Sequence, residues 1–245
     1  MTATLLPLSI AAQPNETTCG PTCLHAVYRY YDDALDLQQV IDDIDPLQDG
    51  GTLDVFLACH ALRRGYRALI HPYNLRIFDP TWFELAREAL TARLQARRRA
   101  RAGDAKLQIA IRGYLEFLEL GGEVRLVDLT PRLIRNYLRR GVPVLTGLSA
   151  TYLYRTAREI PETCAEDDVR GEPVGHFVVL YGHDKETRTV RVADPYSDNP
   201  LADSHYYSVP LERLIGAIFL GIMTFDANLL IIEPRRGRAR NTRQP

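Results

Sequence analysis

The order of its apolar patterns is the feature that most constrains how this chain can fold. Up to about residue 140, apolar side chains recur mainly at helical spacing. Beyond it, β-branched and aromatic runs are short and are divided by Gly, Pro, Asp and Asn. Helices that precede strands, with few alternations between the two, predict an α+β fold in which an amino-terminal helical part packs on a carboxy-terminal antiparallel sheet. The same order disfavours a doubly wound nucleotide-binding fold.

Proline, glycine and capping residues mark where the expected helices begin and end. Pro21 suits the first turn of a helix that begins at or just after Cys19, and Gly65 stops a later helix before a short strand. Thr130 followed by Pro131 gives an N-cap and a first-turn proline. The expected helices are one from Cys19 onward, 36–44, 52–64, two within 79–120, and 130–140; the expected strands are 5–10, 66–71, 143–148, 174–181, 189–192, 206–209, 217–225 and 229–232.

The chain is long enough to bury a core of its own. It has 245 residues, of which 46% are hydrophobic and 25% charged, and this composition excludes fibrous and wholly disordered proteins. We expect one domain over residues 1–234, interrupted at about 79–120 by a helical insertion rich in Ala, Leu, Glu and Arg. Residues 235–245 hold five arginines and almost no apolar side chain, which predicts a disordered basic tail.

The charge balance gives no general attraction for nucleic acid or for an anionic membrane. Thirty Lys and Arg face 31 Asp and Glu, so the net charge is −1 at pH 7. We interpret the arginine run at 87–101 as a solvated helix face with partners such as Glu84 and Glu88, which disfavours nucleic-acid binding. No stretch of 18 uncharged apolar residues occurs, and the amino terminus lacks the positive region of a secretory signal. We therefore expect no membrane span and a cytoplasmic location.

Among the four cysteines, Cys19 has the setting of a nucleophile. It falls at the start of an expected helix, where free backbone N–H groups and the positive end of the helix dipole stabilise a thiolate. Gln13 precedes it by six residues, close enough for its amide to donate to a developing oxyanion. Cys23, Cys59 and Cys164 lack such a setting, and we expect them to be buried core residues. The cysteine spacing matches neither a disulfide scaffold nor a zinc site. Chemistry carried by a thiol nucleophile needs no metal or organic cofactor, and none is expected.

A thiolate nucleophile needs an imidazole to take up its proton, and the imidazole needs a polar partner. His176 opens an expected strand in the segment GHFVVLYGHD, and Asp194 closes the next strand in VRVADPY. If residues 185–188 form the hairpin loop, both side chains lie at the same end of two neighbouring strands. A hydrogen bond between His176 and Asp194 is therefore expected. His183 lies at the far end of its strand, and we interpret it with Asp184 as the entry to the turn.

Together these motifs resemble a known enzyme family. The order Q-x5-C-G-P-T-C-L, a helix followed by a Gly-Val-Pro-Val strand at 132–145, then GHFVVLYGHD and VADPY is similar to bacteriocin-processing cysteine peptidases that cleave double-glycine leaders, and to their stand-alone bacterial relatives. The resemblance covers about two-thirds of the chain and implies a papain-like fold. The arginine-rich stretch 79–120 has no counterpart in that family and no transporter segment follows, so cleavage after a Gly-Gly leader is not carried over.

The resemblance also assigns roles to four residues. It implies that Cys19 is the nucleophile, His176 the general base and acid, Asp194 the residue that orients the histidine, and Gln13 the oxyanion-hole side chain. The implied activity is hydrolysis of a bond in a peptide or protein substrate through a Cys-His-Asp triad. Two alternatives stay open: acyl transfer from the same thioester to an amine, and peptide binding without turnover. The sequence does not indicate the oligomeric state.

An acidic segment follows the expected strand at 143–148. In a papain-like arrangement, residues 155–172 border the cleft, and their carboxylates would favour basic or polar peptides. The alternative interpretation is a plain surface loop. The acidic residues of this segment are Glu159, Glu162, Glu166, Asp167, Asp168 and Glu172.

Overall fold

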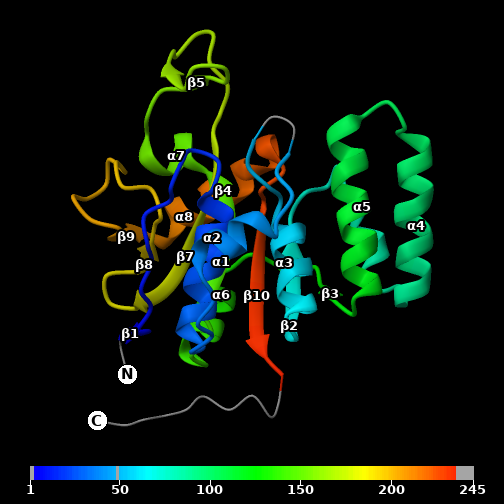
Figure 1. Cartoon of the computed structure of the whole chain (residues 1–245), viewed down its shortest axis with the longest axis horizontal. Helices are drawn as coiled ribbons and strands as arrows, with labels where there is room; N and C mark the ends of the chain where they lie inside the picture. Colours follow the sequence, from blue (N-terminus) through cyan, green and yellow to red (C-terminus); the bar gives the residue numbers. More distant parts are fainter. Residues whose placement is uncertain (1–2, 48–49, 236–245) are drawn as a thin grey trace.

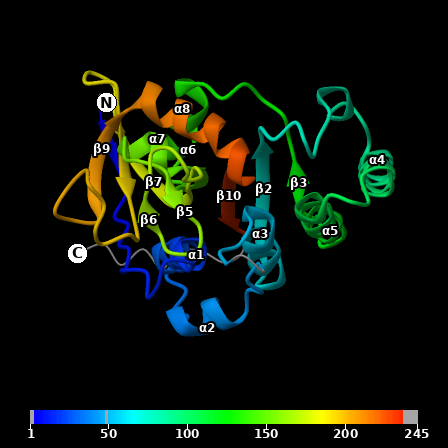
Figure 2. The same cartoon turned by 90° about the horizontal axis from the view of Figure 1, so that it is seen from above.

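The computed structural model describes residues 3–47 and 50–235. Near the amino end, three helices follow one another: α1 (Cys19–Tyr30), α2 (Leu37–Asp42) and α3 (Asp54–Arg63). Pro21 stands in the first turn of α1, and Asp36 caps α2 by accepting a hydrogen bond from the Gln38 amide at 2.9 Å. Helices α1 and α3 cover one face of a central sheet, and α2 packs on the outside of α1 (Figure 2).

Eight strands form one mostly antiparallel sheet within the described part of the chain. Their order across the sheet is β3-β2-β10-β4-β7-β8-β9, and β1 pairs with the second half of β7. The β2–β3 pair is parallel and the other strand pairs are antiparallel. The strands are β1 (Ala3–Leu5), β2 (Tyr66–Pro72), β3 (Glu123–Val124), β4 (Val144–Ser149), β7 (Gly175–Asp184), β8 (Thr189–Ala193), β9 (Tyr206–Pro210) and β10 (Asn228–Pro234). The predicted α+β class, helices first and sheet afterwards, is confirmed.

Further helices cover the opposite face of the sheet. They are α6 (Pro131–Arg139), α7 (Ala150–Tyr154) and α8 (Leu211–Leu220), the last followed by the 3₁₀ helix η2 (Gly221–Thr224). Because both faces of the sheet are covered, β4 is buried at every residue. A small hairpin of β5 (Glu159–Ile160) and β6 (Ala165–Glu166) stands apart from the sheet, beyond α7 (Figure 1).

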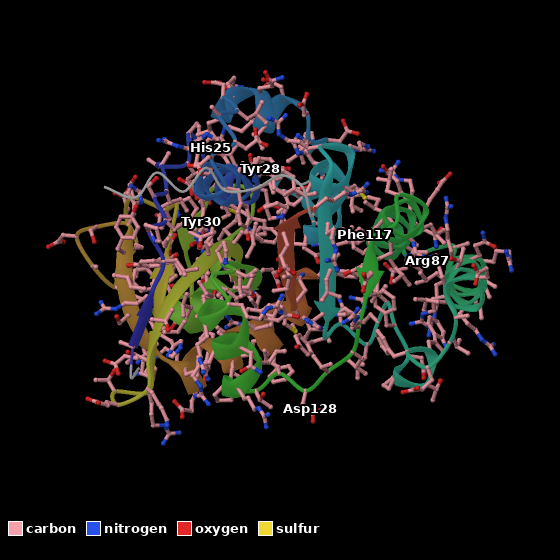
Figure 3. All side chains as sticks on the ribbon, turned by 90° about the horizontal axis from the view of Figure 1, so that it is seen from below. His25, Tyr28, Tyr30, Arg87, Phe117 and Asp128 are labelled. Carbon is pink, nitrogen blue, oxygen red and sulfur yellow. The ribbon has the colours of Figure 1, made fainter. Side chains whose placement is uncertain are left out.

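The arginine-rich segment folds as a helical hairpin at one edge of the sheet. After the 3₁₀ helix η1 (Pro80–Trp82) come α4 (Arg87–Ala100) and α5 (Ala105–Glu119). Asp104 caps α5 by accepting a hydrogen bond from the Leu107 amide at 3.1 Å. Arg87 donates to the Leu118 carbonyl and ties α4 to α5. The hairpin packs beside α3, and Figure 3 places Phe117 on the side of α5 that faces β2.

Helix α1 is held tightly between the sheet and the neighbouring helices. All of its residues except Arg29 are buried, as expected for a helix that is covered on all sides. Gly20 permits close packing, since a Cβ atom at this position would lie 2.8 Å from the Thr52 methyl and 3.3 Å from the Phe177 ring. The amino-terminal end of α1 is therefore fixed against the beginning of β7.

Two predicted strands are wrong. Residues 217–225 form the second half of α8 together with η2, because packing against the sheet overrides the strand preference of their β-branched and aromatic side chains. The buried side chains of α8 recur at helical spacing: Leu211, Leu214, Ala217 and Ile218. At the amino end, β1 covers Ala3–Leu5 instead of residues 5–10, because Pro7 lacks the N–H group that a strand needs.

His183 and Asp184 lead into the turn as predicted, and the Asp184 carboxylate accepts a hydrogen bond from the Glu186 backbone N–H at 2.8 Å. Both belong to β7, which continues past a β-bulge after Leu180 and pairs there with β1 and β8. The loop at 185–188 joins β7 to β8 as predicted. Strand β7 is therefore longer than its hydrophobic pattern indicates.

Two predictions concern the chain as a whole. Among the described residues, the structure holds no helix with the length and apolar character needed to cross a bilayer. Most of the predicted basic tail, residues 236–245, lies outside the described residues.

Candidate active site

The structure places Cys19 at the start of α1 and His176 near the start of β7, with their side chains joined by a hydrogen bond. They are 8% and 7% exposed, respectively. The first-turn amide groups of a helix have no partner within the helix, so Cys19 stands at the positive end of the α1 dipole. This is the setting that favours a thiolate.

The second contact of His176 is with Asp194. The Nε2 atom of His176 lies 2.8 Å from Oδ1 of Asp194. Because Nε2 is engaged there, Nδ1 is the ring nitrogen left for Cys19. Antiparallel pairing of Val179 with Ala193 brings the start of β7 and the residue after β8 to the same end of the sheet. The hairpin thus lines up Cys19, His176 and Asp194 in one hydrogen-bonded chain.

Asp194 is completely buried, and both of its carboxylate oxygens accept hydrogen bonds. Oδ1 also accepts from the Tyr196 backbone N–H at 2.9 Å. Oδ2 accepts from the Tyr154 hydroxyl at 2.6 Å and from the Tyr207 hydroxyl at 2.5 Å. A buried carboxylate with this many donors is held in its charged form and in one orientation.

Sequence reasoning missed the two tyrosines that hold Asp194. Tyr207 carries a weak signal, since it falls on the buried side of the alternating strand β9. Tyr154 belongs to α7, a short helix that the sequence analysis did not predict, and nothing in its local pattern links it to Asp194. Only the packing of α7 against the sheet brings the Tyr154 hydroxyl to the carboxylate.

The charges of this cluster reinforce one another. Burial disfavours a charged imidazole, but Asp194 and Cys19 outweigh it and raise the pKa of His176 to about 10. Burial likewise works against ionisation of Asp194, yet His176 and the two tyrosine hydroxyls hold the pKa of this carboxyl below its usual value. His176 is therefore an imidazolium at neutral pH, paired with an ionised carboxylate on one side and a sulfur atom on the other.

His183, the competing histidine, lies in different surroundings. Burial, followed by the charges of Arg135 and Arg139 on α6, lowers its pKa. Helix α6 lies on the face of the sheet opposite α1 (Figures 2 and 3). His183 is thus set apart from Cys19, and the site contains His176.

Gln13 lies on the loop before α1. Its backbone N–H donates to the Pro195 carbonyl at 2.9 Å, which anchors this loop beside the residue that follows Asp194. Its side-chain Nε2 donates to the Asn15 carbonyl at 3.0 Å. An amide nitrogen carries two N–H groups, so one of them is left for a further acceptor. The Pro195 contact is what links Gln13 to the site.

The other cysteines divide into two kinds. Cys23 is buried beneath the site, where its Sγ atom donates to the Phe177 carbonyl at 3.2 Å and burial raises its pKa. Burial also raises the pKa of Cys59, to about 12. These two are core residues, as predicted. The prediction for Cys164 is wrong: it is exposed at the turn between β5 and β6, a hairpin too small to bury it.

A cavity of about 400 Å³ opens beside Cys19. Its wall combines the loop before α1, the residues before α3, the β5–β6 hairpin and the segment after η2. The first turns of α5 complete it through Lys106 and Ile109, so the arginine-rich hairpin borders the cavity instead of closing over it. A volume of this size accommodates several side chains of a peptide.

Two buried carboxyl groups lie next to this cavity. Asp226 lines it, and its Oδ2 atom lies so close to Gly175 that a Cβ atom there would approach within 2.2 Å. Burial raises the pKa of Asp226 to about 7. Burial and then the charge of Asp226 raise the pKa of Asp54, on α3, to about 8. Near neutral pH the two carboxyls therefore do not carry two full negative charges.

The imidazole titrations provide a test of this geometry. In an NMR titration we expect His176 to lose its proton near pH 10, whereas burial lowers the pKa values of His25, His60, His71 and His183 below the usual 6.5. Replacing Asp194 with Asn removes the largest favourable charge, so the His176 titration should move down by at least about one pH unit. A His176 signal that titrates near 6.5 in the parent protein would contradict the arrangement.

Comparison with known sequences gives one match to a family. Residues 123–215 match the sequence profile of the Peptidase_C39 like family. The matched segment contains His176 and Asp194, and it ends before η2. No curated protein matches this chain in sequence.

Comparison with solved structures gives distant likenesses. A double glycine motif protease from an AMS/PCAT transporter, in complex with its leader peptide, is 15% identical, with 94% of each chain covered and a TM-score of 0.46. The peptidase domain of Streptococcus ComA, a bifunctional ABC transporter involved in quorum sensing, is 12% identical over 93% of this chain and 99% of that one, at 0.44. Xylellain, a cysteine protease from Xylella fastidiosa, is 14% identical over 96% and 87%, at 0.45.

Proposed function

We propose that this protein is a papain-like cysteine peptidase that hydrolyses peptide bonds. The observation that carries the proposal is the hydrogen-bonded chain from Cys19 through His176 to Asp194, beside a cavity large enough for a peptide. A cysteine that only filled space would not need an imidazolium held by a buried carboxylate. The match of residues 123–215 to the Peptidase_C39 like family supports the same assignment.

The first half of the proposed reaction is attack by sulfur. The Cys19 thiolate adds to the carbonyl carbon of the scissile bond, and the carbonyl oxygen takes the negative charge. The His176 imidazolium then gives its proton to the leaving amine, the carbon–nitrogen bond breaks, and a thioester to Cys19 remains. A His176 pKa of about 10 keeps this proton available at neutral pH.

In the second half of the proposed reaction, water hydrolyses the thioester and releases the carboxylic acid product. Neutral His176 takes a proton from a water molecule, the resulting hydroxide adds to the thioester carbonyl, and the carbon–sulfur bond breaks. Sulfur leaves as the thiolate, and His176 is again an imidazolium. Asp194, held by Tyr154 and Tyr207, keeps the imidazole in one orientation through both halves.

Gln13 is the proposed side-chain donor to the oxyanion. Its loop is anchored beside Asp194 through Pro195, and one N–H of its amide is left over after the Asn15 contact. Together with the Cys19 backbone N–H it would stabilise the charge that forms on the carbonyl oxygen. Replacing Gln13 with Ala should lower kcat by about 10²–10³-fold with the fold retained, as judged by circular dichroism. An unchanged kcat would remove Gln13 from the mechanism.

Two further proposals concern the chain around the site. We propose that residues 1–234 act as one domain, since α5 of the arginine-rich hairpin packs on α3 and lines the cavity. We also propose that the protein works in the cytoplasm, where a cysteine nucleophile stays reduced.

A peptide-library experiment tests the proposed function. The protein is incubated with short peptides from a digested proteome in ¹⁸O-labelled water, and new termini are read by mass spectrometry. We expect new carboxyl termini that carry ¹⁸O, because water resolves the thioester. Added glycinamide reports on the alternative, since acyl transfer would give amide-capped products in place of acids. Absence of any new terminus, with intact protein, would contradict both reactions and favour peptide binding without turnover.

A further inference from the structure

The cavity beside Cys19 is lined by three glutamates that form no ion pair with another described residue. Glu16, Glu159 and Glu172 all line it, and none of the three takes part in an ion pair within residues 3–47 and 50–235. By contrast Asp167, on the same hairpin but outside the cavity, is bound to Arg170 at 2.7 Å. Lys106 is the one lysine or arginine among the described lining residues, so the three glutamates outnumber it and leave an excess of negative charge in the cavity.

Two of these carboxylates, Glu16 and Glu159, interact electrostatically with each other and with Tyr196, a neighbour of His176. Burial, followed by the charges of Glu16 and Glu166, raises the pKa of Glu159 on β5. Glu16 and Glu159 also act together on the Tyr196 hydroxyl, and the Tyr196 ring lies 6.3 Å from the His176 ring. Two like charges held in this position repel each other unless a cation lies between them.

The unpartnered hydroxyl of Thr52 is a second and independent observation that indicates a ligand site in this cavity. It lines the same cavity, is 7% exposed, and its hydroxyl has no hydrogen-bond partner among the described residues. A buried hydroxyl without a partner costs free energy, which an N–H group of a bound ligand would recover.

We propose that this part of the cavity is a subsite for the basic side chain of an arginine or lysine in the substrate, bound by Glu16 and Glu159. The inference rests on the proposed function and adds the class of substrate to it. A guanidinium carries five N–H donors in a planar fork, which suits two carboxylates and a hydroxyl better than a single point charge does. Arginine is therefore the preferred residue.

Only some of the carboxylates in the acidic segment 155–172 line the cavity and can contact a substrate there. Glu162, Glu166 and Asp168 are exposed on the hairpin and do not line the cavity. Glu162 belongs to the same hairpin as Glu159 and carries the same charge, so Glu162→Gln is a matched control for Glu159→Gln.

The test uses pairs of peptidyl chloromethyl ketones that carry either arginine or citrulline, a neutral residue of nearly the same shape. The pair is made with this residue at each of the three positions before the reactive carbonyl, and alkylation of Cys19 is timed by mass spectrometry. At one position we expect arginine to react about 5- to 10-fold faster than citrulline, with the ratio falling as salt is added. The ratio should drop to within about twofold in Glu159→Gln and in the Glu16→Gln/Glu159→Gln double variant, and persist in Glu162→Gln.

A second readout separates failure of this inference from failure of the proposed function. Fluorescein-labelled peptide amides with the same arginine or citrulline are titrated into Cys19→Ala, and anisotropy reports binding without any chemistry at the thiol. Reaction of Cys19 with equal rates for the two residues at every position would overturn the subsite and leave the peptidase proposal standing. If Cys19 is unreactive toward all the ketones, the peptidase proposal fails; tighter binding of the arginine peptide then supports the subsite, and equal binding overturns it.

Discussion

Replacing Cys19 with alanine is expected to reduce peptide cleavage to the background rate. In hydrolases that act through a covalent intermediate, loss of the nucleophile costs on the order of 10⁶-fold in kcat, and without the Cys19 sulfur no thioester can form. The substitution removes one sulfur atom from a nearly buried position at the start of α1, so the fold should survive. Cleavage is followed by mass spectrometry on any peptide found in the library experiment, and folding by circular dichroism.

Cys164 provides the matched control for this experiment. It is a free thiol that lines the same cavity, but it is exposed on the β5–β6 hairpin, and it is not part of the hydrogen-bonded chain through His176 and Asp194. Cys164→Ala should therefore keep kcat within about twofold of the parent. Loss of turnover in Cys164→Ala, with full turnover in Cys19→Ala, would mean that the wrong thiol has been assigned as the nucleophile.

Replacing His176 with alanine is expected to have the next largest effect. It removes both proton transfers and the cation beside the sulfur, so kcat should fall by at least about 10³-fold. The effect is visible without a substrate, through iodoacetamide labelling of each cysteine between pH 5 and 9. In the parent protein Cys19 should react faster than Cys164 below neutral pH, because the His176 imidazolium stabilises a thiolate there. In His176→Ala this advantage should be lost.

The two buried cysteines, Cys23 and Cys59, serve as internal controls for unfolding in the labelling experiment. Burial raises the pKa of Cys23 and of Cys59, so neither should react in the folded protein, and their labelling would report unfolding. Because His176→Ala leaves the buried Asp194 without its cation, His176→Asn serves as a second variant that retains a polar contact. If Cys19 labels like Cys164 at every pH in the folded parent, the thiolate–imidazolium pair does not form.

Much of the fold and part of the site could be predicted from sequence because their signals are local. Pro21 and the apolar spacing after it place Cys19 at the first residue of α1. The short loop between β7 and β8 makes a hairpin, and a hairpin brings His176 and Asp194 to one end. Each of these inferences needs only neighbouring residues and the geometry of one element or one turn.

The predictions for residues 217–225 and for Cys164 are wrong because long-range packing outweighs the local sequence signal there. The segment 217–225 has the composition of a strand, but the sheet offers its buried residues a helical packing surface, and α8 forms. Cys164 has the composition of a core residue and lies on an exposed hairpin. In both places the surroundings decide the outcome, and the surroundings come from distant parts of the chain.

The α+β class, the helix start at Cys19 and the His176–Asp194 pairing follow from local sequence signals, since caps, periodicity and hairpin loops act over a few residues. Three features depend on the tertiary structure: Tyr154 and Tyr207 fix Asp194, Glu16 and Glu159 line one cavity, and α5 borders that cavity. These contacts join segments far apart in the chain, and they exist because burying the sheet between two helical layers brings those segments together.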